Sequence, residues 1–283
     1  MKRSRYALPY QVWMALFIIV PIFIVLYYAC TTSNGASVSF SLENLAQVFS
    51  PTYLTVLVRS LWIALVATLI CLLIGYPVAS ILASRHFKRS SLILMLIIIP
   101  MWMNFLLRTY AWINLLDTNG LIAKLLGLVG LGNVSLLYNT TAVIIGLVYN
   151  FLPFMILPIY TILSKMQPQL IEAAEDLGAN SFQVFRKVKL PLSMPGIVSG
   201  ITMVFIPATT TFAVSRLLGG GQVMMYGELI ENQFLFTRNW HFGAALSLVM
   251  MVLVLVLHVQ QETMETKTIT EYGLWCVWQT WSG

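Results

Sequence analysis

Charged residues and reactive side-chain clusters are scarce in this chain. Only 9% of its 283 residues are Asp, Glu, Lys or Arg, whereas 59% are hydrophobic. A water-soluble domain of this length needs more charge to cover its surface, so a soluble globular protein is excluded. The three cysteines and three histidines stand apart in the sequence, without HExxH, CxxC or P-loop spacing. The sequence therefore shows no metal cluster, no nucleophile–base pair and no ATP site, and predicts a chain that is not an enzyme.

Long apolar runs are what the chain does contain. Roughly 20 consecutive apolar residues span a bilayer as a helix, and in lipid each spanning segment must satisfy its own backbone hydrogen bonds. The runs predict an all-α, multi-pass membrane domain over 1–260. We expect the first run to be a retained span, because it is too long for a signal-peptide core and no clear cleavage site follows. The six predicted spans lie at roughly 11–30, 55–83, 91–116, 139–163, 195–216 and 240–260.

The positive charges favour one orientation of these spans. With the N-terminus inside, eleven of the 16 Lys and Arg residues fall on the inner side of the membrane. Cytoplasmic segments carry such an excess, so both termini and the loop at 164–194 are predicted to be cytoplasmic. The same bias accounts for the net charge of +6 without a nucleic-acid partner.

One inner segment, EAAEDLGANSFQVFRKVKLP at 172–191, is polar between two apolar runs. Gly178 is placed to end a first short helix, and Asn180 or Ser181 to begin a second. We expect Pro191 to end the second helix. Each helix has an apolar face, formed by Leu170, Ala173, Ala174 and Leu177 in the first and by Phe182, Phe185 and Val188 in the second. The pattern suits either a segment that docks in a groove of a partner protein or one that lies on the membrane surface.

The spacing within this segment resembles the EAA motif of ABC importer permeases. Glu172-Ala173-Ala174 is followed after three residues by Gly178, and after nine more by Val188-x-Leu190-Pro191, where the family has Ile at the position of Val188. The resemblance implies a type I permease fold whose loop is a coupling helix, docked on a separate ATPase that binds the ATP and Mg. It implies no cofactor in this chain. The predicted coupling residues are Glu172, Ala173, Ala174, Gly178, Phe182, Phe185, Val188, Leu190 and Pro191.

Further stretches resemble the spermidine/putrescine branch of this family. They are GYP at 75–77, RTYAW at 108–112, GLVYNFLPFMILPIY at 146–160, LPLSMPGIVSG at 190–200 and NWHFGAALSL at 239–248. The resemblance implies import of polyamines by alternating access in a bacterial inner membrane. It also implies a second related permease, two ATP-binding subunits and an extracellular substrate-binding protein. The alternatives are a permease for another small solute or, less favoured, an ATP-independent secondary transporter, for which we find no deep acidic residue or internal repeat.

The segment at 261–283 departs from the family. It carries one Lys, three acids and three Trp, where permeases usually have basic residues. It is either a frameshifted or chimeric end or an interfacial tail.

A path for polyamines needs carboxylates or carbonyl dipoles and aromatic faces, because the substrates are cations on aliphatic stems. The candidates on the outer side are Trp102, Tyr110, Asp117, Tyr149, Glu228 and Glu231. These residues also fit the ordinary roles of aromatic anchors at the interface and solvated loop acids. Arg108 is expected near the outer interface, either as a structural residue whose charge reaches water or as part of a gate or a contact with a partner.

Overall fold

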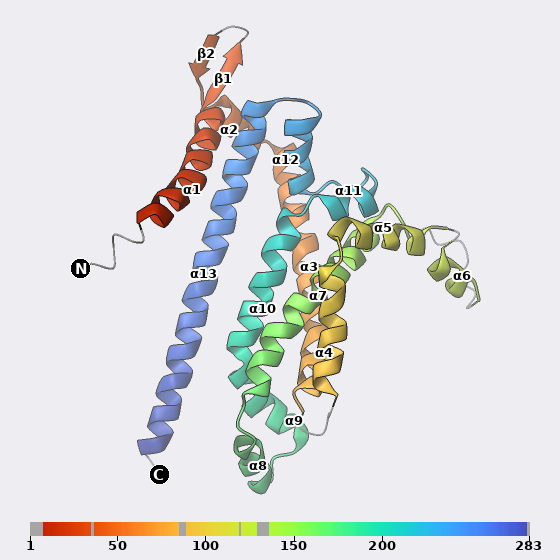
Figure 1. Cartoon of the computed structure of the whole chain (residues 1–283), viewed down its shortest axis with the longest axis vertical. Coiled ribbons are helices and arrows are strands. Elements are labelled where there is room, and N and C mark those ends of the chain that lie inside the picture. Colours follow the sequence, from red (N-terminus) through yellow and green to blue (C-terminus); the bar gives the residue numbers. More distant parts are fainter. Residues whose placement is uncertain (1–7, 35–36, 85–88, 119, 129–135, 282–283) are drawn as a thin grey trace.

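The computed structural model describes residues 8–34, 37–84, 89–118, 120–128 and 136–281. Its core is formed by three helices that pack side by side: α3 (Pro51–Leu82), α7 (Thr140–Ser164) and α10 (Leu190–Thr210) (Figure 1). Their buried faces are rich in small residues. A Cβ at Gly196 would lie 2.9 Å from the Pro158 carbonyl oxygen, so α10 and α7 approach each other at backbone distance.

Two further long helices pair beside this core. α1 (Leu8–Ala29) lies along α13 (Trp240–Trp281), which contacts α10 (Figure 1). In the described residues, five helices are long and apolar enough to cross a membrane, and a bent pair makes a sixth if it counts as one span. α13 continues past the predicted span end at 260, and the backbone of 261–281 belongs to the same helix.

The bent pair replaces the continuous span expected at 91–116. α4 (Ser90–Ile98) leads into the short 3₁₀ helix η2 (Ile99–Trp102), and α5 (Phe105–Leu116) leaves at 97°. Two sequence features produce the break. Pro100 lacks an N–H for the helix ladder. The Asn104 side chain caps α5 by accepting hydrogen bonds from the amides of Leu106 and Leu107, at 2.8 and 3.4 Å. α6 (Leu121–Leu128) continues from α5.

Pro191 does not end a helix as expected. α9 (Ser181–Val184), the π-helical turn η3 (Phe185–Lys189) and α10 follow one another without a break. The wide turn of η3 ends at Lys189, two positions before Pro191, where the regular ladder loses a donor. At its other end α10 stops at Thr210, because Thr211 has extended backbone. α11 (Ala213–Gly219) then begins, within the range expected for the fifth span.

A second cluster of buried residues lies at the opposite end from α8 (Gln169–Asp176) and α9. It joins α2 (Glu43–Val48) and α12 (Tyr226–Leu235) to the ends of α1 and α13, below a hairpin of β1 (Thr31–Asn34) and β2 (Ser37–Phe40) (Figure 1). Two hydrogen bonds tie it to α3. The Ser60 hydroxyl accepts from the Tyr226 amide at 2.7 Å, and Arg59 donates to the Met224 carbonyl at 2.6 Å.

Candidate functional site

The polar loop projects from the core as two short helices, α8 and α9, at the end opposite to the hairpin (Figure 1). Gly178 follows α8 with φ of +83°, and a Cβ there would meet nothing within 4 Å. The backbone conformation, and not a lack of space, therefore favours glycine. Asn180 starts α9 with a reciprocal cap. Its side chain accepts from the Gln183 amide at 2.8 Å, and its own amide donates to the Gln183 side chain at 2.9 Å.

The two faces of α8 have different surroundings. Glu172 and Glu175 line a cavity of about 400 Å³ between α8 and the ends of α3 and α7. Lys189 lines the same cavity, and no salt bridge joins it to either carboxylate among the described contacts. The apolar face, with Leu170 and the 89% exposed Leu177, is open. This open face is available for a partner protein.

The two phenylalanines of the predicted coupling set also differ. Phe182, on α9, is 67% exposed. Phe185 is half-buried, and its ring meets the Tyr76 ring of α3 edge-on, with centroids 5.6 Å apart. Ala173 and Gly178 are exposed, whereas Val188 of η3 and Leu190 and Pro191 at the start of α10 are half-buried. The loop thus has an outer part, open to solvent, and an inner part held by the core.

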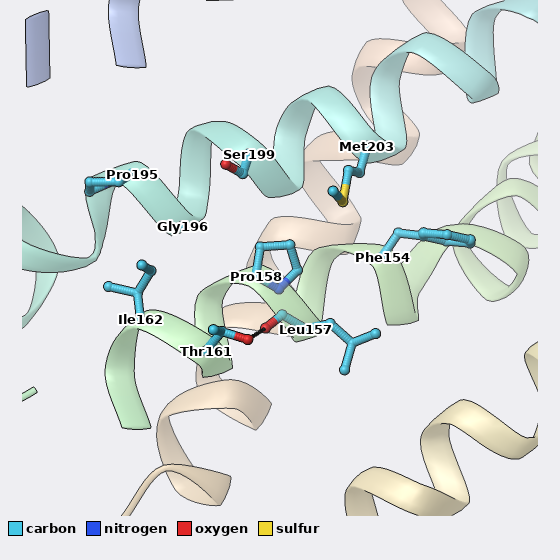
Figure 2. Close-up of a pocket in the computed structure, with 9 residues that line it drawn as sticks. All are labelled: Phe154, Leu157, Pro158, Thr161, Ile162, Pro195, Gly196, Ser199 and Met203. Atoms are coloured by element: carbon cyan, nitrogen blue, oxygen red, sulfur yellow. Dashed lines mark hydrogen bonds between the residues drawn. The ribbon is translucent and has the colours of Figure 1, made fainter. Parts of the chain in front are cut away.

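An apolar groove of about 430 Å³ runs between α7 and α10 (Figure 2). Phe154, Leu157, Pro158, Thr161 and Ile162 of α7 and Pro195, Gly196, Ser199 and Met203 of α10 line it. The Thr161 hydroxyl donates to the Leu157 carbonyl at 2.8 Å, within α7. No charged side chain belongs to the lining, so the groove suits an apolar helix better than a cation.

Four of the six predicted substrate-path residues lie on or beside α5 and α7 with exposed side chains. Trp102 is 88% exposed at the bend, and Tyr110 is exposed on α5. The Tyr149 ring lies 5.2 Å from that of Trp112. Asp117 is exposed at the end of α5, where its carboxylate accepts from the Thr118 amide at 2.8 Å. These side chains give this part of the molecule an aromatic surface with one carboxylate.

The other two predicted residues, Glu228 and Glu231, belong to α12 and contact α11. Glu228 is only 4% exposed, and burial raises the pKa of its carboxyl, partly offset by the Ser215 hydroxyl. Glu231 accepts from Arg216 at 2.8 Å, and the guanidinium lies 4.7 Å from the Phe236 ring centre. Both acids therefore help to hold α11 against α12. Sequence reasoning missed Ser215, which gives no signal of its own.

Two buried polar side chains near α5 have an atom without a hydrogen-bond partner in the described contacts. They are Arg108, through its Nε, and Asn150 of α7, through its Oδ1. Arg108 lies 5.8 Å from the Phe105 ring centre, and α5 contacts α7. Sequence reasoning singled out Arg108 but not Asn150. Among the residues that the structure describes, no three His, Cys, Asp or Glu side chains gather as a metal site.

Apolar spans around a small-residue core, with a projecting two-helix loop, define a multi-pass membrane permease. The chain belongs to the family described as the binding-protein-dependent transport system inner membrane component, whose sequence profile matches residues 72–269. A spermidine/putrescine transport system permease protein, PotB of Haemophilus influenzae, is 42% identical over 250 residues, 87% of each chain. PotB of Escherichia coli K12 is 40% identical over 245 residues, 85% of this chain and 89% of that protein.

Solved structures share the fold. A chain of a bacterial ABC transporter that imports the acidic polysaccharide alginate gives a TM-score of 0.74, with 17% identity over 93% of this chain and 94% of that one. The same transporter in complex with its alginate-bound periplasmic protein gives 0.73, with 16% identity over 93% of both chains. The fold is that of a type I ABC importer permease.

Proposed function

We propose that this chain is the membrane-spanning subunit of an ATP-driven importer that moves polyamines, such as spermidine and putrescine, into the cytoplasm. Two relatives with about 40% identity over most of the chain are spermidine/putrescine permeases. Coupling to an ATPase is supported by the open apolar face of α8. Its Leu177 is almost fully exposed in a loop that has the EAA spacing.

The α8–α9 loop docks in a groove of the ATPase in this proposal. A short helix that offers two alanines and exposed apolar side chains matches the way amphipathic helices bind grooves. Ala173 and Ala174 allow a partner backbone to approach closely, while Leu177 and Phe182 are the apolar anchors. Gly178 sets the angle between the two helices. ATP and Mg bind to the partner, and this chain binds no cofactor.

Two other surfaces of the chain, the apolar groove and the hairpin end, supply contacts for the remaining subunits. A second, related permease packs on the apolar groove between α7 and α10 (Figure 2), which would otherwise expose an uncharged hollow. Two ATP-binding subunits meet the loops of the two permeases. An extracellular binding protein delivers the substrate at the hairpin end. The loop and both termini are cytoplasmic in this arrangement, in agreement with the excess of Lys and Arg on that side.

The exposed aromatic and acidic residues beside the bend form the outer part of the substrate path. Trp102, Tyr110 and Tyr149 offer ring faces to an ammonium group, and Asp117 offers a carboxylate. Glu228 and Glu231 shape this end through their contacts with α11, instead of meeting the substrate first.

Uptake of labelled spermidine and putrescine tests the proposal. A transport-deficient strain would express the whole transporter with this chain in its wild-type form or as Asp117→Asn. We expect ATP-dependent uptake by the wild type and a several-fold higher KM for the variant. Copurification of an ATPase without polyamine uptake would mean a permease for another small solute. Uptake that needs no ATPase would mean a secondary transporter.

A further inference from the structure

We propose that Tyr76 connects the α8–α9 loop to α3, so that movement of the loop moves this span. The inference rests on the proposed function, since it assigns a positioning residue to the same coupling loop. α10 follows the loop covalently, whereas α3 meets the end of the loop through the Tyr76 side chain.

Tyr76 contacts the first residue of the π-helical turn η3 and a residue of α10 beyond the turn. Its ring meets Phe185, the first residue of η3, at an interplanar angle of 83°. Its hydroxyl lies 3.0 Å from the Ser193 hydroxyl in α10. Because the Ser193 hydroxyl donates to the Leu190 carbonyl at 3.0 Å, the Tyr76 hydroxyl donates to Ser193. Tyr76 itself is buried in the core cluster, so these contacts are shielded from water.

The turn η3 has the physical properties of a joint between the loop and α10. A π-helical turn is wider and less regular than an α-helix, and such turns are frequent at functional sites. η3 stands where the polar loop ends and the apolar α10 begins. Movement of the loop therefore concentrates at Phe185–Lys189, the segment that Tyr76 contacts at one end and bridges to Ser193 at the other.

Helix α3, on the other side of this contact, is also built to respond to movement of the loop. Pro77, directly after Tyr76, lies inside α3 and removes one backbone hydrogen bond, which makes this the point where α3 bends most easily. Gly75, directly before it, brings α3 close to α7, where a Cβ would lie 3.0 Å from the Met155 side chain. A displacement of Tyr76 thus acts on α3 beside its proline and beside a close contact with α7.

Transport stoichiometry in the reconstituted complex tests the proposal. The complete transporter in proteoliposomes would carry Tyr76→Leu, Phe185→Leu, both changes, or Tyr76→Phe. The control is Tyr53→Leu, because Tyr53 lies on the same helix, with its ring 4.8 Å from Phe242 at the outer end. The quantity measured is polyamine imported per ATP hydrolysed.

We expect Tyr76→Leu to lower this ratio roughly fivefold or more. The double change should be no worse than Tyr76→Leu alone, since Tyr76→Leu already removes the ring contact that Phe185→Leu removes. Tyr76→Phe keeps the ring and should lower the ratio by a smaller factor, about two- to threefold. The control should keep the wild-type ratio. A wild-type ratio in Tyr76→Leu, an equal loss in the control, or a proportional fall of uptake and ATP hydrolysis would each overturn the proposal.

A second measurement does not depend on the substrate. Spin labels on cysteines introduced at Ile81 of α3 and Gln169 of α8, both exposed, would report the distance between span and loop in a complex whose native cysteines are replaced. With wild-type Tyr76 the distance distribution should be the same with and without ATP, whereas Tyr76→Leu should broaden it on ATP binding. An unchanged distribution in Tyr76→Leu, or a shift in the wild type, would contradict the connection. Failure of polyamine uptake in the wild type would count against the proposed substrate alone.

Discussion

Gly178 offers a direct test of the loop, because its requirement for glycine is conformational. Its φ of +83° lies in the left-handed region, and a Cβ there would meet nothing. A side chain at such a position costs about 1–2 kcal/mol for the backbone alone. Since about 1.4 kcal/mol corresponds to a factor of ten, Gly178→Ala should reduce the population of the docking-competent loop by roughly 5- to 30-fold. Gly178→Asn should reduce it less, because Asn tolerates this conformation.

The assay is the apparent affinity of the purified permease complex for its ATPase, measured by titration in nanodiscs. Gly221→Ala is the matched control, since Gly221 has φ of +78° with equally open surroundings but lies between α11 and α12. We expect the affinity to fall for Gly178→Ala and to stay unchanged for the control. Equal behaviour of the two variants, or a larger effect of Asn than of Ala at 178, would refute the reasoning.

Three further predictions concern single side chains. Phe182→Ala should weaken ATPase binding roughly tenfold or more, as for an apolar anchor, while the thermal midpoint of the permease stays unchanged; a normal affinity would remove Phe182 from the interface. Asn180→Ala removes the cap of α9 and about 1 kcal/mol, so amide exchange at 181–184 should accelerate about fivefold; unaltered exchange would argue against the cap. The raised pKa of Glu228 means that the folded chain keeps this proton at pH values where the unfolded chain has lost it, so stability falls as pH rises above its ordinary 4.5. In Glu228→Gln the thermal midpoint should fall less steeply with pH, measured from pH 4.5 upward, than in the wild type. An equal slope in the two proteins would contradict the burial argument.

The loop shows how far sequence reasoning reached. The glycine bend and the cap at Asn180 depend on local backbone chemistry, and both are present. The difference in exposure between Phe182 and Phe185 could not be predicted, because Phe185 packs on Tyr76, more than 100 positions away in the sequence. The continuation through Pro191 was missed for a local reason, since nothing in the sequence marks a π-helical turn.

Helices α5 and α12 show a second limit. The bend at Asn104 had a sequence signal, a proline followed by a good capping residue, but the apolar composition of the run outweighed it. The burial of Glu228 had none, because its environment is made by α11 and α12 together. Hydropathy locates apolar segments well, yet it does not determine which acids are exposed to a substrate.

The central claim is that the α8–α9 loop of this permease meets the ATPase. Its most direct test is photo-crosslinking from a benzoyl-phenylalanine placed at Phe182 in the assembled transporter. Phe236, which is similarly exposed beyond α12 at the opposite end, is the control position. The account predicts an adduct with the ATPase from position 182 and none from position 236. An ATPase adduct from 236, or its absence from 182 in a complex that hydrolyses ATP, would contradict the account.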